Sequence, residues 1–189
     1  MSPEIAEIER WSSLKVWCFG LCNRSPKSNL AAVDRLELLP EDRFIDLGCG
    51  LGAALEHAVV TGAEVTGIDP SPAMVTRALQ RVSGAEVREG SAESIPFEDD
   101  RFTAALAVST YHHWADPEAG LAEVQRVLSP GGRLLIVERK LKKSTGHGID
   151  VAGAEQLRQS LIAQDFDPVD IGELVAGRHR YLAVSGISL

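Results

Sequence analysis

Three glycines at alternate positions, Gly48, Gly50 and Gly52, follow an apolar run that ends near the carboxylate of Asp46. Glycine adopts backbone angles that other residues avoid, and it places no side chain between the main chain and a ligand. The following residues continue with helical spacing, so the pattern predicts a strand, a tight turn and a helix N-terminus, where backbone N–H groups can meet a bound molecule. We therefore expect this loop to contact a cofactor closely.

A second carboxylate indicates which kind of cofactor the loop would bind. Asp69 ends the next predicted strand, residues 64–68, at a position where a carboxylate can accept hydrogen bonds from both hydroxyls of a ribose. The glycines together with Ala53 also fit the relaxed fingerprint of a nicotinamide dinucleotide site, which keeps that interpretation open. Asp46 argues against it, because a carboxylate before the turn repels a pyrophosphate and attracts a cationic amino group. A ribose and a cationic amino group together describe S-adenosylmethionine.

Five motifs, in order along the chain, resemble those of the class I S-adenosylmethionine-dependent methyltransferases of small molecules, of the ubiquinone and menaquinone methyltransferase type. They are Asp46–Gly52, Gly67–Ser71 with Met74, Gly90–Phe97, Tyr111–Glu118 and Glu123–Gly132. The resemblance implies an α/β fold, a Rossmann-like three-layer sandwich. Its mostly parallel seven-stranded sheet has the order 3-2-1-4-5-7-6, with strand seven antiparallel and helices on both faces.

The same resemblance implies which residues bind S-adenosylmethionine. These are Asp46, Gly48, Cys49, Gly50, Gly52, Asp69, Pro70, Met74, Gly90, Ser91, Ala92, Ser109 and Tyr111. Relatives usually carry Asp where this chain has Ser91, and that side chain accepts a hydrogen bond from the adenine amino group. A serine accepts a weaker, uncharged bond, so a lower cofactor affinity is expected.

His112 is the candidate catalytic residue, because the segment after the fourth strand faces the methyl group in this family. Methyl transfer from a sulfonium is an in-line displacement that needs alignment and exclusion of water, and a base only if the nucleophile carries a proton. Imidazole titrates near neutrality, which suits His112 to that task. The alternative is that His112 and His113 only form hydrogen bonds around the turn.

The periodicity of apolar residues predicts the elements that position these groups. Strands are expected at residues 44–47, 64–68, 85–88, 102–108 and 133–137, and helices at 29–38, 51–61, 71–82, 117–128 and 152–164. This alternation predicts a parallel sheet with helices on both faces. The tail, around 168–171 and 181–184, predicts a closing antiparallel hairpin. Residues 1–28 are expected to form a helical cover over the cofactor, and residues 29–189 a single methyltransferase domain.

Composition narrows the classes of function. The 189 residues with 44% hydrophobic content suit one domain. They leave no room for a separate substrate domain of the kind found in dehydrogenases, which argues against a nicotinamide cofactor. A net charge of −8 argues against a nucleic-acid partner. No apolar run is long enough to span a membrane and no signal-peptide pattern is present, so a cytoplasmic protein is expected. A small-molecule methyl acceptor is the expected partner, and a homodimer stays open.

Two further features bear on function. The three cysteines fit no disulfide framework and no metal site. The basic run from Arg139 to Lys143 either forms a solvated loop, which we favour, or helps to hold an anionic group of the substrate. The sequence thus favours an enzyme that methylates a small molecule. A cofactor-binding module without turnover and an NAD-dependent oxidoreductase remain as alternatives.

Overall fold

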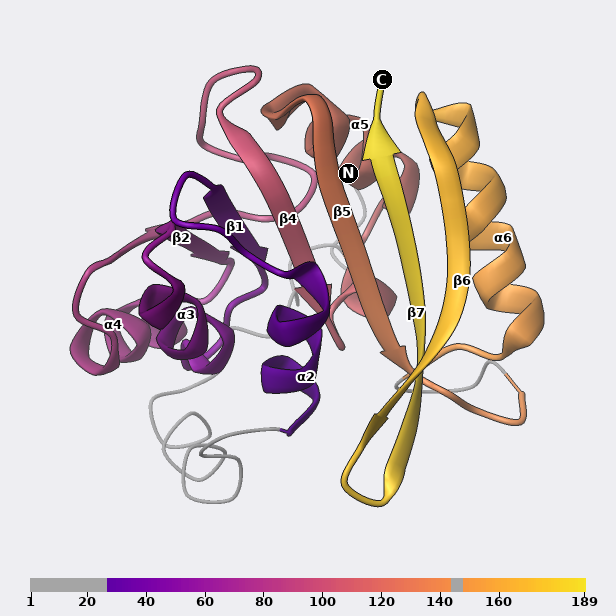
Figure 1. The fold of residues 1–189 in the computed structure, drawn as a ribbon, viewed down its shortest axis with the longest axis horizontal. Helices are drawn as coiled ribbons and strands as arrows, with labels where there is room; N and C mark the ends of the chain where they lie inside the picture. The colour runs from indigo at the N-terminus through magenta and orange to yellow at the C-terminus, as the bar shows by residue number, and fades with distance from the viewer. Residues whose placement is uncertain (1–26, 144–147) are drawn as a thin grey trace, which may run out of the picture.

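A single sheet forms the centre of the computed structural model, which describes residues 27–143 and 148–189 (Figure 1). Its seven strands are β1 (Arg43–Leu47), β2 (Glu64–Asp69), β3 (Ala85–Glu89), β4 (Phe102–Val108), β5 (Leu128–Arg139), β6 (Phe166–Ala176) and β7 (His179–Ser188). Their order is β3-β2-β1-β4-β5-β7-β6. Strand β7 is antiparallel to both neighbours and the other pairs are parallel. The predicted fold is therefore confirmed.

Helices cover both faces of the sheet (Figure 1). They are α2 (Lys27–Leu36), α3 (Ala53–Ala58), α4 (Pro72–Arg81), α5 (Pro117–Val127) and α6 (Val151–Ala163), with short 3-10 turns η2 (Val59–Thr61) and η3 (Tyr111–His113). One core cluster takes buried residues from α2, α3 and α4, and the other takes them from α5 and α6. We call the two sides of the sheet the α2 face and the α5 face.

Strand β4 shows how the sequence assigns side chains to these faces. Ala104 and Leu106 pack in the core of the α2 face, whereas Ala105 and Ala107 pack in the core of the α5 face. Successive residues of a strand point to opposite faces, and a central parallel strand is buried on both. The uninterrupted apolar run of β4 follows from this position. The same alternation assigns a face to each residue of the other strands.

The largest differences from the predicted elements lie in the last three strands. Strand β5 begins at Leu128, not at residue 133, and takes in Pro130 and Gly131 through an irregularity opposite Phe102 and Ala104. A Pro-Gly pair usually ends a strand, which is why the sequence predicted a later start. Strands β6 and β7 are also longer than predicted, and their hairpin projects beyond the sheet near the N-terminal end of α2 (Figure 1).

One prediction falls largely outside what the structure describes. The helical cover over residues 1–28 lies outside the described residues apart from its last two positions, so it stays a prediction. None of the helices in the described ranges is long and apolar enough to cross a membrane. Within the same ranges, no cluster of three or more His, Cys, Asp or Glu side chains is arranged to hold a metal ion.

Candidate functional site

The glycine loop between β1 and α3 uses its three glycines for different purposes. All three have a positive φ, +73° at Gly48, +53° at Gly50 and +77° at Gly52, a conformation that favours glycine. A β-carbon at Gly48 would lie 2.3 Å from Oγ1 of Thr110, and one at Gly52 would lie 2.9 Å from Cγ2 of Val82. A β-carbon at Gly50 would meet nothing within 4 Å. Gly48 and Gly52 thus permit packing, whereas Gly50 faces open space.

The backbone donors of this loop are engaged within the protein. The N–H groups of Gly48 and Cys49 both donate to the carbonyl of Ile68 at 2.9 Å, and that of Gly52 donates to the carbonyl of Cys49 at 2.9 Å. The N–H of Gly50 donates to Oδ2 of Asp69 at 2.9 Å. The expectation that a ligand rests on these N–H groups is therefore wrong at the three glycines and at Cys49. The loop instead lets a ligand approach the backbone closely. A pyrophosphate would bind poorly there, because it needs available N–H donors.

Asp69 lies at the carboxyl end of β2 and is 8% exposed. Its Oδ1 accepts the N–H of Ser71 at 2.9 Å, and its Oδ2 accepts that of Gly50. Burial raises the pKa of Asp69 above its ordinary value, and these two backbone bonds partly oppose the shift. Each carboxylate oxygen can accept a further bond. The carboxylate is thus fixed in orientation and still able to accept hydroxyl donors.

Asp46 is a buried carboxylate without a full set of partners. It is 2% exposed, and its Oδ2 has no hydrogen-bond partner in the described part of the chain. Burial, with the charge of nearby Asp69 as a second cause, raises the pKa of Asp46 to about 7. Buried charges are normally paired, so a buried carboxylate with an oxygen that has no partner among the described residues is unusual.

A cavity of about 270 Å³ lies beside the glycine loop. Gly48, Cys49, Gly50, Leu51 and Ala53 line it from the loop and α3, and Val108 and Ser109 line it from the end of β4. The sequence motifs missed Ser28 and Asn29 of α2 and Tyr181 of β7, which complete the wall. These three come from the first and last elements of the described chain, and no local pattern marks them, because only the sheet topology brings them to the loop.

The predicted adenine-binding segment follows β3 and lies next to Asp69. The N–H of Gly90 donates to the backbone carbonyl of Asp69 at 3.2 Å, and Ala92 is buried. Pro70 is exposed and Met74 is buried in α4. Of the thirteen predicted cofactor-binding residues, Gly48, Cys49, Gly50 and Ser109 line the cavity. Asp69 is hydrogen-bonded to one of these, Gly50.

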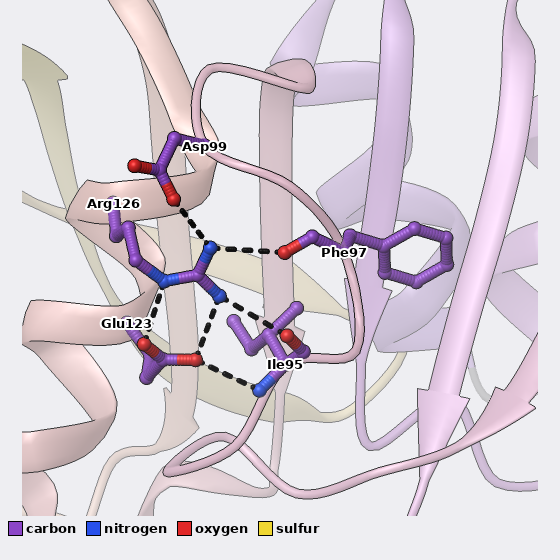
Figure 2. A network of polar contacts seen from close by, with 5 residues as sticks. All are labelled: Ile95, Phe97, Asp99, Glu123 and Arg126. Atoms are coloured by element: carbon purple, nitrogen blue, oxygen red, sulfur yellow. Dashed lines mark hydrogen bonds and ion pairs between the residues drawn. The ribbon is translucent and has the colours of Figure 1, made fainter.

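Figure 2 shows how the loop after this segment is held on α5. Arg126 donates to both oxygens of Glu123, to Asp99 at 2.8 Å, and to the carbonyls of Phe97 at 2.9 Å and Ile95 at 3.1 Å. Glu123 in turn accepts the N–H of Ile95 at 3.0 Å. The Glu123 and Asp99 carboxylates raise the pKa of Arg126, so it stays charged. The predicted motif Glu123–Gly132 thus acts partly by fixing the loop that follows Ser91 and Ala92.

Glu93 has a structural role in this region. Its Oε1 accepts the N–H of Ala115 at 2.7 Å and that of Asp116 at 3.3 Å. Asp116 is the N-cap of α5 and accepts the N–H of Ala119 at 3.1 Å. Glu93 therefore ties the segment after β3 to the entrance of α5.

His112 is held by a carboxylate that the sequence analysis did not single out. Its Nδ1 lies 2.8 Å from Oε2 of Glu138, and its backbone N–H lies 3.4 Å from Oε1. Glu138 is fully buried at the carboxyl end of β5, and His112 follows the carboxyl end of the neighbouring strand β4. The signal for Glu138 in the sequence was a charged residue directly after the apolar run of β5. The carboxylate orients the imidazole, as in a base and its orienting partner.

The segment after β4 divides between the two faces. Ser109, with a φ of +54°, lines the cavity, whereas Tyr111 packs against Trp114 with ring centroids 5.1 Å apart at the core of the α5 face. Burial raises the pKa of Tyr111 above its ordinary value. Neither Tyr111 nor His112 lines the cavity. Their predicted contacts with cofactor or acceptor therefore stay predictions.

Comparison with known proteins agrees with this geometry. The sequence profile of a family described as a methyltransferase domain matches residues 45–136. An uncharacterised methyltransferase of Mycobacterium tuberculosis is 33% identical over 138 residues, covering 73% of this chain and 54% of that protein. A demethylmenaquinone methyltransferase of Thermus thermophilus is 40% identical over 114 residues, covering 57% of this chain and 51% of that protein. The chain thus spans about half the length of these relatives.

The fold is also found among solved structures. A putative methyltransferase of Haloferax volcanii, solved in complex with the Trm112 methyltransferase activator, superposes with a TM-score of 0.81 at 20% identity. The match covers 96% of this chain and 97% of that one. At this identity the similarity shows the fold alone.

Proposed function

Because the chain belongs to the class I S-adenosylmethionine-dependent methyltransferases, we propose that it transfers a methyl group from this cofactor to a small-molecule acceptor. The observation that carries the proposal is the unpaired buried carboxylate of Asp46 beside a loop whose central glycine, Gly50, faces open space. A cofactor with a cationic amino group supplies the missing partner of Asp46. A dinucleotide pyrophosphate would bring more negative charge to the same place.

The residues of the site fit the cofactor in distinct roles. Asp69 accepts the ribose hydroxyls, Asp46 faces the amino group, and Ser91 and Ala92 meet the adenine. Gly50 lets the chain approach the ligand closely. When bound, the cofactor supplies a methyl group on a positively charged sulfur, which is already activated toward a nucleophile.

The protein then has to align the acceptor, exclude water and, for some acceptors, remove a proton. We assign proton removal to His112, with Glu138 as its positioning residue. An ionised carboxylate can only accept a hydrogen bond, so in this role the N–H at Nδ1 of His112 donates to Glu138, 2.8 Å away, and Nε2 is the nitrogen that takes up the proton. A hydroxyl or an ammonium acceptor needs this step, whereas a thiolate or a free amine does not.

Asp69→Ala is expected to weaken binding of S-adenosylmethionine by about 2–4 kcal/mol, because two charge-assisted hydrogen bonds are lost and water replaces them only in part. Isothermal titration measures the change. Asp34→Ala is the control, since Asp34 is an exposed carboxylate on α2 that pairs with His57. An Asp69→Ala protein that is folded and binds with unchanged affinity would exclude the ribose role.

Binding of the cofactor is expected to strengthen as the pH rises toward about 7. The pKa of Asp46 is raised to about 7, so below this pH the carboxyl is largely protonated and attracts a cation poorly. A cationic amino group beside it favours the ionised form, so binding releases a proton, with a limit of about tenfold in affinity per pH unit. Titrations of S-adenosylhomocysteine between about pH 5.5 and pH 7.5 measure the slope. A flat profile in the wild-type protein would contradict the pairing of Asp46 with the amino group.

Asp46→Asn is expected to remove this slope and to stabilise the ligand-free protein at higher pH. A carboxyl whose pKa is raised on folding binds more protons in the folded state, so its ionisation costs stability as pH rises from the ordinary value of 3.8 to about 7. The melting temperature of Asp46→Asn should therefore exceed that of the wild type by a few degrees at pH 8, and the gain should disappear near pH 4. An equal gain at both pH values would point to packing instead of charge.

A methyl-transfer screen tests the proposed activity. The full chain is incubated with radiolabelled S-adenosylmethionine and panels of hydroxyl, amine, thiol and quinol acceptors, with a demethylmenaquinone included because the Thermus thermophilus relative bears that name. Label in an acceptor, absent with Gly50→Val, supports the proposal. Tight cofactor binding with no transfer to any panel would favour the cofactor-binding module without turnover.

A further inference from the structure

The cavity has a second rim, where β5 and the β6–β7 hairpin end beside α2. Arg139, the last residue of β5, pairs across the ladder with Tyr181 of β7, which lines the cavity. Directly opposite residues of neighbouring strands place their side chains on the same face. Tyr181 packs against the core of the α2 face. Arg139 therefore lies on the α2 face as well, next to a wall of the cavity.

The basic groups on this rim lack carboxylate partners in the part of the chain that the structure describes. Arg139 donates from Nη2 to Nδ1 of His179 at 3.3 Å. Lys27 lies against the hairpin turn, since a β-carbon on Gly177 would meet its Cδ at 3.3 Å, and it directly precedes Ser28 in the cavity wall. Within residues 27–143 and 148–189, neither Arg139 nor Lys27 forms an ion pair with a carboxylate.

The neighbouring basic residues on the opposite face share one carboxylate partner. Lys140 and Arg180 both pair with Glu173 of β6, Arg180 at 3.2 Å. Glu173 stands opposite Leu182, which packs in the core of the α5 face. Strand alternation thus separates two cations that share Glu173 on one face from two cations that have no carboxylate partner among the described residues on the face where the cavity lies. This occurs in a chain whose net charge is −8, so a general excess of basic residues does not account for it.

The position of the rim assigns it to the acceptor and not to the cofactor. The glycine loop follows β1, and the sheet order places β4 and β5 between β1 and β7. Neighbouring strands lie about 4.8 Å apart, so Tyr181 is about 14 Å across the sheet from the strand that carries the loop. The cofactor's amino acid end is expected at the loop and at the end of β4, one to two strands short of Arg139.

We propose that Arg139 and Lys27, beside Tyr181, form a subsite for an anionic group, a phosphate or a carboxylate, on the methyl acceptor. The guanidinium of Arg139 presents paired donors that match either group, and Lys27 adds a second positive charge. This inference rests on the proposed function for the identity of its ligand as an acceptor. The anion subsite itself can be measured separately.

The first arm of the test uses pyrophosphate as the probe anion. The full chain, saturated with S-adenosylhomocysteine, is titrated with pyrophosphate as wild type, Arg139→Gln and Arg180→Gln. Arg139→Gln is expected to weaken binding about tenfold or more, because a charge-assisted bond is lost. Arg180→Gln removes the same charge from the adjacent strand on the opposite face and is expected to change affinity less than about twofold. Equal losses in both variants, or no pyrophosphate binding to the wild type, would overturn the subsite.

The second arm separates the acceptor from the carboxylate of the cofactor. Wild type and Arg139→Gln are titrated with S-adenosylhomocysteine and with 5′-methylthioadenosine, which lacks the amino acid. Affinities unchanged by the substitution support an acceptor subsite. Weaker binding of S-adenosylhomocysteine alone would mean that Arg139 holds the cofactor's carboxylate, which overturns the proposal. If the wild type fails to bind S-adenosylhomocysteine, the proposed function fails, and pyrophosphate titration of the ligand-free protein still reports on the subsite.

Discussion

Gly50→Val is expected to abolish measurable binding of S-adenosylmethionine while the protein stays folded. The β-carbon at this position points into space where nothing lies within 4 Å, and Gly50 lines the cavity. A branched side chain there fills the place of the ligand and meets few protein atoms. The φ of +53° adds backbone strain for any other residue, on the order of 1–2 kcal/mol.

A matched control separates strain from obstruction. Gly84 also has a positive φ, +92°, and a β-carbon there would likewise meet nothing within 4 Å, but it lies in the turn before β3. Gly84→Val should lose a similar amount of thermal stability and keep its cofactor affinity. Isothermal titration with circular dichroism measures both quantities. Normal binding by Gly50→Val would show that the turn does not touch the ligand.

His112→Asn is expected to lower the rate of methyl transfer to a hydroxyl or ammonium acceptor by about 10²–10⁴-fold, the usual contribution of a general base. Binding of S-adenosylhomocysteine should change little, since His112 does not line the cavity. Glu138→Gln should also lower the rate, because the neutral amide supports the basic imidazole less well than the buried carboxylate does. The pH dependence of the rate should shift in this variant, which a purely structural role would not produce.

The protein supplies its own control for a histidine paired with a carboxylate. His57 of α3 lies 2.7 Å from Oδ1 of Asp34 on α2, nearly the same distance as in the His112–Glu138 pair, but Asp34 is exposed whereas Glu138 is fully buried. His57→Asn should leave the rate within about twofold of the wild type after correction for stability. Equal losses of rate in His57→Asn and His112→Asn would contradict the role of base. So would full activity in His112→Asn toward a hydroxyl acceptor.

The sequence predicted those parts of the molecule that local patterns determine. The strands β1, β2 and β4 and the carboxylates at positions 46 and 69 lie in single stretches, and the structure brings the two carboxylates to the same loop. The strand order came from the family resemblance, not from periodicity. The role of the loop's N–H groups was predicted wrongly, because the sequence does not show that the carbonyl of Ile68 and the carboxylate of Asp69 already accept them.

The residues that the sequence analysis missed depend on contacts between distant segments. Tyr181 reaches the cavity only because β7 inserts between β5 and β6, and Glu138 meets His112 only because β4 and β5 are neighbours. Arg126 shows the same limit, since its partners in residues 95–99 are fixed by the packing of α5 (Figure 2). Spacing within one segment carries no signal for such contacts.

Isothermal titration of the full chain with S-adenosylhomocysteine and, separately, with NADH tests the central claim most directly. We predict saturable binding of S-adenosylhomocysteine at a single site, lost in Gly50→Val and retained in Gly84→Val, and no binding of NADH at the same concentrations. Binding of NADH that S-adenosylhomocysteine displaces, or a folded wild-type protein that does not bind S-adenosylhomocysteine, would contradict the assignment of this site.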